Sequence, residues 1–191
     1  MKWLIKNWYK STIFLAVYLT ITLALFIMRQ NYALFLIWIQ TPVYFLHQFE
    51  EYVLPGGFMA FFNTKMLGSK NPDLPLDEKM SFWINGSIIF IAFPISAVLA
   101  TLFDLPFGIW AAYFSVVNAA SHVAMFFKHR YNPGFVVSFL VNIPVGVYTI
   151  WYFASNRIIP VSAHMIGLLI AIAVQGVVMF YGFKILKPQI K

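Results

Sequence analysis

The sequence predicts an all-α, multi-pass transmembrane helical bundle with six spans, and three observations point to this class. Of its 191 residues, 61% are hydrophobic and 10% are charged, whereas soluble domains average about 25% charged residues. The mean hydropathy is +0.79. Several nearly uncharged runs approach or exceed the roughly 20 residues that a bilayer crossing requires. The length fits a single transmembrane domain over residues 1–191.

Six apolar segments are predicted to span the membrane, at about residues 11–28, 32–53, 81–102, 106–127, 133–154 and 160–183. The first run follows three lysines, as in a signal peptide. It is too long for one and shows no clear small-residue cleavage site, so we expect it to stay as an anchor. Pro42, Pro94 and Pro144 fall inside the second, third and fifth segments, where proline can kink a helix and open a cavity.

The lysines and arginines predict the orientation of the spans. Eleven of the 13 lie before the first span, in the loops after the second and fourth spans, or after the sixth. The other two lie in the loops on the opposite side. The excess of positive charge marks the cytoplasmic side, so we predict a cell-membrane protein with both termini in the cytoplasm.

Composition excludes several classes of site and partner. The chain has no cysteine, which excludes disulfides, thiolate metal sites and cysteine nucleophiles. Its net charge of +7 could suggest nucleic acid, but the basic residues lie at the ends of apolar runs. That distribution sets membrane orientation, and we expect no nucleic-acid partner.

The second predicted span ends with the sequence HQFEE, which contains His47, Glu50 and Glu51. With about 100° of rotation per residue, the three side chains fall within one arc of a helix. Ionisable groups inside a membrane are costly and usually functional. The alternative is that these side chains only extend to the interface at the end of the span.

The fourth span carries Asn118 and His122 on one face, in the sequence NAASH. His122 lies about 8 Å below the cytoplasmic end of its span and His47 about 9 Å below the end of the second span. We therefore expect one pocket in the cytoplasmic half of the bundle, unless each histidine is only a packing residue. Asn85, near the start of the third span, could reach the same level, whereas His164 lies near the outer side.

The fourth span leads into the turn YNPG, from Tyr131 to Gly134. A proline followed by a glycine makes a tight turn. We expect this turn to cover the pocket, with the Tyr131 hydroxyl donating a hydrogen bond to a substrate oxyanion or a carboxylate. An ordinary cytoplasmic turn is the alternative.

The motifs HQFEE, NAASH and YNPG, in this order over about residues 47–134, resemble the HXXEE-domain family of bacterial integral membrane proteins. The resemblance implies a membrane enzyme whose active site these motifs form. It implies no particular reaction.

Two histidines and a carboxylate suffice for a catalytic zinc ion, which takes three protein ligands and a water. We therefore predict a divalent metal, zinc in the first place, held by His47, His122 and either Glu50 or Glu51. The remaining glutamate would act as the general base in a metal-assisted hydrolase. Asn118 would orient a ligand or the substrate. A pocket at membrane level that faces the cytoplasm favours a lipid or lipid-linked substrate.

Two other functions remain open. A buried glutamate pair could activate water without a metal, as in a glutamate-dependent membrane hydrolase or protease. The site resembles the CAAX-processing type of protease in this respect, but Pro55 stands where an arginine would be expected. A proton- or ion-coupled transporter would also use buried carboxylates and histidines, but here the polar residues gather on one side of the membrane.

Overall fold

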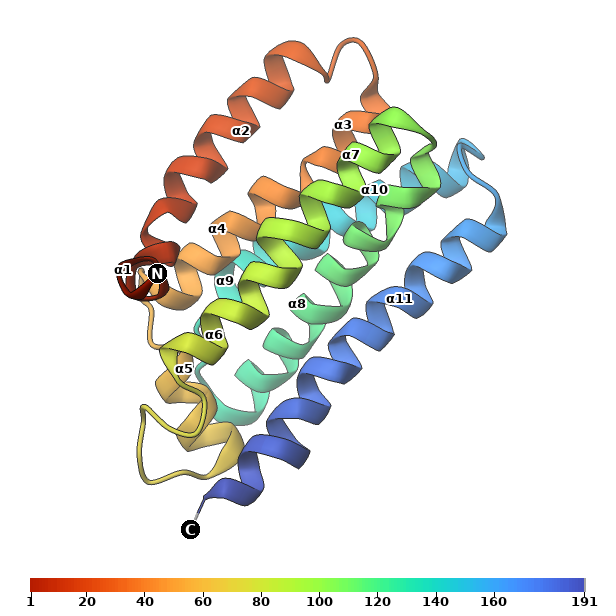
Figure 1. Cartoon of the computed structure of the whole chain (residues 1–191). Coiled ribbons are helices and arrows are strands. Elements are labelled where there is room, and N and C mark those ends of the chain that lie inside the picture. The colour runs from red at the N-terminus through yellow and green to blue at the C-terminus, as the bar shows by residue number, and fades with distance from the viewer. Residues whose placement is uncertain (191) are drawn as a thin grey trace.

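The computed structural model describes residues 1–190, which form helices and connecting segments without a β-strand. Figure 1 shows the bundle. Its α-helices are α1 (Lys2–Asn7), α2 (Thr12–Phe26), α3 (Tyr32–Trp38), α4 (Gln40–Tyr52), α5 (Phe58–Phe61), α6 (Glu78–Asn85), α7 (Phe93–Leu102), α8 (Ile109–His129), α9 (Phe135–Val137), α10 (Ile143–Ser155) and α11 (Val161–Phe180). Short 3₁₀ helices and four π-helical segments extend or join them. The predicted all-α class is confirmed.

Within residues 1–190, five helical segments are long and apolar enough to cross a membrane: Lys2–Phe26, Glu78–Leu102, Leu105–His129, Phe135–Ser155 and Val161–Gln189. Large apolar side chains on these segments, such as Phe14 and Leu169, are exposed. A surface of this kind suits the bilayer rather than water. The segments correspond to five of the six predicted spans.

The remaining predicted span, residues 32–53, folds as two helices. α3 ends at Trp38 and α4 begins at Gln40. The break falls at Ile39, directly after the residue four before Pro42, Trp38. A proline ring clashes with the carbonyl of the residue four before it, which disturbs the helix at that point. Neither helix alone is long enough to cross a bilayer. A total of six spans and the cytoplasmic position of both termini therefore stay predictions, although Figure 1 shows both termini at the same end of the bundle as α5.

Three of the π-helical segments have a cause in the sequence, because each ends two residues before a proline. They are Gly86–Ala92, Ser138–Asn142 and Tyr181–Leu186, followed by Pro94, Pro144 and Pro188. A proline lacks an N–H group and clashes with the carbonyl four residues before it, which lies inside the π-helical segment in each case. The wider π-helical turn accommodates this missing hydrogen bond.

Polar side chains fix the starts of two helices and the connection after α5. Asn31 accepts a hydrogen bond from the Leu34 N–H group at the start of α3, and Asp77 accepts one from Met80 at the start of α6. Buried Asn63 donates to two backbone carbonyls of the polar loop, those of Pro72 and Leu76. These bonds hold the loop between Leu67 and Glu78, the polar loop, against the end of the bundle where α5 lies.

Candidate metal centre

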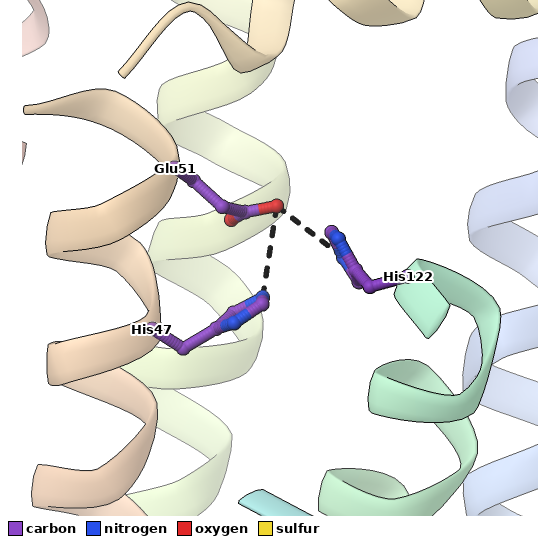
Figure 2. A group of neighbouring side chains, drawn as sticks. All are labelled: His47, Glu51 and His122. Carbon is purple, nitrogen blue, oxygen red and sulfur yellow. Dashed lines mark ion pairs between the residues drawn. The ribbon is translucent and has the colours of Figure 1, made fainter. Parts of the chain in front are cut away.

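Three ionisable side chains meet between α4 and α8, as Figure 2 shows. His47 and Glu51 come from α4, where a spacing of four residues places both on one face. His122 comes from α8. All three are almost completely enclosed, with exposed fractions of 1%, 3% and 3%. The two imidazole rings lie 4.7 Å apart, centroid to centroid.

The separations within this group are informative about its chemistry. The Glu51 Oε1 atom lies 3.6 Å from His47 Nε2 and 3.4 Å from His122 Nε2. Both distances exceed the 2.7–3.2 Å of an N–H···O hydrogen bond. Two ligands of one tetrahedral zinc, each about 2.0–2.1 Å from it, would lie about 3.4 Å apart. One ligand atom from each residue lies within 4.8 Å of the others, so the three side chains are close enough together to hold one metal ion.

The opposite ring nitrogens of both histidines have polar partners. His122 Nδ1 lies 3.0 Å from Asn132 Oδ1, and His47 Nδ1 lies 3.4 Å from Ser138 Oγ. An Nδ1–H group that donates to such an oxygen leaves Nε2 free to bind a metal. The second oxygen of Glu51 accepts a hydrogen bond of 2.9 Å from Gln48 Nε2. Each of the three side chains is thus oriented from outside the group.

Gly134 packs directly against the three side chains. A Cβ atom at this position would lie 2.8 Å from His47 Cε1, 3.0 Å from Glu51 Cγ and 3.1 Å from His122 Nδ1. The residue also has a φ angle of +92°, which favours glycine. The predicted turn therefore does lie over the pocket, and its backbone forms one wall of the group.

Glu50 does not join the three side chains. Its Oε1 atom accepts from the Val136 N–H group at 2.9 Å, and its Oε2 atom accepts from Val137 at 2.6 Å. These two N–H groups belong to the first turn of α9, which has no partner for them within its own helix. Glu50 therefore acts as an N-cap supplied by another helix. The two adjacent glutamates have different partners.

The other predicted site residues, Asn118 and Tyr131, lie farther from the group's centre. Asn118 borders the same cavity as His47 and His122, and its Nδ2 atom donates to Gln175 Oε1 at 3.1 Å. Tyr131 is 51% exposed and its ring packs edge-on against Phe61. It is not among the residues that line the cavity. Its neighbour Asn132 is the turn residue that contacts the site.

A cavity opens beside the three side chains, with about 80 Å³ accessible to the centres of water-sized spheres. A single water needs about 10–15 Å³ on this measure, so the cavity has room for several small groups. Most of its walls are apolar, including Tyr44, Phe58, Phe62, Phe114 and Leu186.

The cavity also contains a polar group that the sequence did not single out. The Tyr52 hydroxyl accepts hydrogen bonds from Ser81 Oγ at 2.9 Å and from Asn85 Nδ2 at 3.0 Å. Ser81 and Asn85 lie one helical turn apart on α6. The four-residue spacing of Ser81 and Asn85 places both side chains on one face of α6, which is visible in the sequence. That both contact Tyr52 of α4 depends on the packing of the helices, which the sequence does not reveal.

A protein-family model, described as a protein of unknown function with HXXEE motif, matches residues 38–149. Comparison with curated proteins and with solved structures finds no match for this chain. The family match covers more than half of the sequence, and it includes His47, Glu51 and His122. The chain therefore belongs to the family of proteins with the HXXEE motif.

Proposed function

We propose that this protein is an integral membrane hydrolase that uses a divalent metal, zinc in the first place, at a site facing the cytoplasm. The observation that carries the proposal is the spacing of Glu51 from the two histidines. Both separations exceed the usual length of an N–H···O hydrogen bond and are close to the separation of about 3.4 Å expected between two ligands of one zinc ion. His47, Glu51 and His122 would be the ligands.

The charge balance of the site supports a cation. Within residues 1–190, the ion-pair and hydrogen-bond partners of the Glu51 carboxylate are two histidines and Gln48, with no lysine or arginine among them. A buried carboxylate without a compensating positive charge is costly. A bound divalent ion would supply that charge, and neutral histidines are suitable ligands for it.

When bound, a metal of this kind polarises a substrate carbonyl and makes its bound water acidic enough to attack near neutral pH. The protein's own residues would orient the substrate. The Tyr52 hydroxyl already accepts two hydrogen bonds, so its own hydrogen remains for a third partner. We assign it the role of donor to the developing oxyanion, in place of Tyr131. Asn118 would contact the substrate from the α8 wall.

Glu50 takes a positioning role in this proposal. Both of its oxygens accept N–H groups from the first turn of α9, which leaves it poorly placed to receive a proton from water. By fixing α9, it also holds Gly134 and Ser138 against the two histidines. The HXXEE sequence would thus supply two ligands, His47 and Glu51, and one support for the opposing turn.

The surroundings favour a lipid or lipid-linked substrate. The site lies among helices whose outer faces are apolar, and most of the cavity wall is aromatic or aliphatic. A water-soluble substrate would lose its hydration on entering such a cavity. An ester or amide at the end of a hydrocarbon chain would lose much less.

The test is the metal content of protein purified in detergent without chelators. We expect one zinc per chain in the wild type and less than a tenth of that in His47→Ala, His122→Ala and Glu51→Gln. His164→Ala is the matched control, because His164 pairs with Tyr113 near the other end of the bundle. Hydrolysis of a chromogenic long-chain ester should decline with the zinc.

Two results would contradict the proposal. One is wild-type protein that binds no divalent metal even after dialysis against zinc. The other is equal zinc loss in His164→Ala and in the three ligand variants, which would indicate general unfolding. Retained ester hydrolysis without metal would instead support the glutamate-dependent alternative, and an ion flux in liposomes that requires Glu51 would support a transporter.

A further inference from the structure

A second, larger cavity lies beside the metal-binding group, between two of the membrane-spanning segments. It runs along α6 and the π-helical segment Gly86–Ala92 on one side and along the C-terminal end of α11 and the start of the segment Tyr181–Leu186 on the other. Its volume, on the measure used above, is about 680 Å³. Small-molecule sites typically have volumes of about 300–1,000 Å³, so this groove alone is large enough for a ligand.

The groove and the smaller cavity share part of their walls. Four residues line both: Ile84, Ile88, Val178 and Tyr181. The metal-binding group, Tyr52 and Asn118 lie on one side of these shared side chains, and the groove lies on the other. A ligand in the groove would therefore need to pass only these side chains to bring its end into the cavity.

The groove opens on the outer surface of the bundle. Trp83 and Val177, which also line it, are 49% and 68% exposed. Both lie on segments that are apolar enough to span a membrane. The groove is therefore open toward the acyl chains of the bilayer, and the four shared side chains separate it from the cavity.

One end of the groove is polar and the rest is apolar. Asp77 and Lys79 lie at the start of α6, and Ile88 lies about 16 Å farther along the helix axis. Charged residues at the end of a span mark the level of lipid head groups. The groove therefore has the polarity of a lipid, with a charged end at the interface and an apolar part beside the hydrocarbon region.

We propose that this groove binds a hydrocarbon chain of an acylated amphiphile, which enters sideways from the bilayer and places its ester or amide carbonyl in the cavity. The polar head would lie near Asp77 and Lys79. Ile84 and Val178 would contact the chain next to the carbonyl. The reaction at the carbonyl rests on the proposed function, whereas binding of the chain does not.

The test is binding of a fatty acid that carries a photoreactive diazirine near its end, measured as cross-linked peptides by mass spectrometry. The protein is full-length and reconstituted in phosphatidylcholine nanodiscs. We expect cross-links on α6 and on the second half of α11, and we expect excess lysophosphatidylcholine to compete with them. Ile84→Trp and Val178→Trp should reduce cross-linking at least tenfold by filling the groove.

Ile95→Trp is the matched control, because Ile95 is exposed on the same membrane segment and does not line the groove. It should cross-link as the wild type does. Equal labelling of all apolar faces, or equal labelling of Ile84→Trp and the wild type, would overturn the proposal. So would a stable dimer whose interface covers the groove.

Zinc content, measured on the same samples, separates this inference from the proposed function. Ile84→Trp and Val178→Trp should keep the zinc of the wild type, because neither residue is a ligand. Specific cross-links in a protein without zinc would leave the groove established and refute the metal-dependent hydrolase. Bound zinc without specific cross-links would refute the groove and leave the metal centre.

Discussion

Replacing Gly134 by alanine should damage the proposed metal centre although none of its proposed ligands is replaced. The new methyl carbon would lie within 3.1 Å of atoms in His47, Glu51 and His122. Placing extra atoms in a well-packed site typically costs about 1–3 kcal/mol. Holding a non-glycine residue at the φ of +92° costs roughly 1–2 kcal/mol more. The free energy of unfolding should therefore fall by about 2–5 kcal/mol.

Gly57→Ala is a control that separates the two contributions. Gly57 has a φ of +87°, but a methyl carbon added there would have no other atom within 4 Å, so only the backbone cost applies. The difference between the two variants should be about 1–3 kcal/mol. If the ligand side chains move to relieve the contact, zinc affinity should fall by a corresponding factor of about 5–150.

The assay combines thermal unfolding in detergent with competition for zinc against a chromogenic chelator. We expect Gly134→Ala to unfold at a lower temperature than Gly57→Ala and to release zinc at a lower chelator concentration. If Gly134→Ala kept wild-type zinc affinity and lost no more stability than Gly57→Ala, the Gly134 backbone would not be a wall of the site.

Four further predictions test other contacts. Glu50→Gln should lose one of the two charge-assisted hydrogen bonds to α9, and thermal unfolding should show a loss of about 1.5–3 kcal/mol in the free energy of unfolding. Zinc should remain bound. Loss of zinc at unchanged stability would instead make Glu50 a ligand. Asn132→Ala should weaken zinc binding by about 10–100-fold, measured by chelator competition, and an unchanged affinity would show that His122 needs no such support. Tyr52→Phe should reduce ester hydrolysis by about 10²–10³-fold at unchanged zinc content; wild-type rates would remove Tyr52 from the mechanism. In the cysteine-free chain, a membrane-impermeant thiol reagent applied to whole cells should label Asn156→Cys and leave Ser69→Cys unlabelled, and the reverse pattern would invert the predicted orientation.

The sequence was informative where helical periodicity alone determines position. The similar depths of His47 and His122 follow from the rise per residue, and the structure brings their rings together. The choice between Glu50 and Glu51 could not be made in this way. Around the helix axis, Glu50 lies about 60° from His47 in one direction and Glu51 about 40° in the other. Which of them faces α8 depends on how α4 is rotated against its neighbours.

The turn after α8 is a second feature that the sequence did not predict correctly. Tyr131 was expected to point into the pocket, but Asn132 contacts His122 instead. α8 ends at His129, and the next residue, Arg130, adopts a left-handed conformation with a φ of 59°. This conformation reverses the chain direction within one residue, and nothing in the composition of the turn reveals it.

The π-helical segments are a third feature that the sequence did not predict. Four occur within residues 1–190, and each contributes at least one residue to the site region: Phe62, Ile89, Ser138 and Tyr181. A proline follows three of the segments, but a proline alone does not specify a π-helical turn. Pro42 is accommodated by a break between α3 and α4 instead, so the same type of residue is met by two different local structures.

The division of the site between chain segments has a consequence for biosynthesis. The three proposed ligands and their supports, Asn132 and Ser138, all precede α10, whereas Gln175, Val178 and Tyr181 reach the cavity from α11 and the segment that extends it. As the ribosome extends the chain, the metal-binding group can form before the wall that separates it from the bilayer. When α11 packs against the other helices, it closes the side of the cavity that would otherwise be exposed to lipid. A chain that ends at Ser155 should therefore be able to bind zinc but not to shield it from lipid.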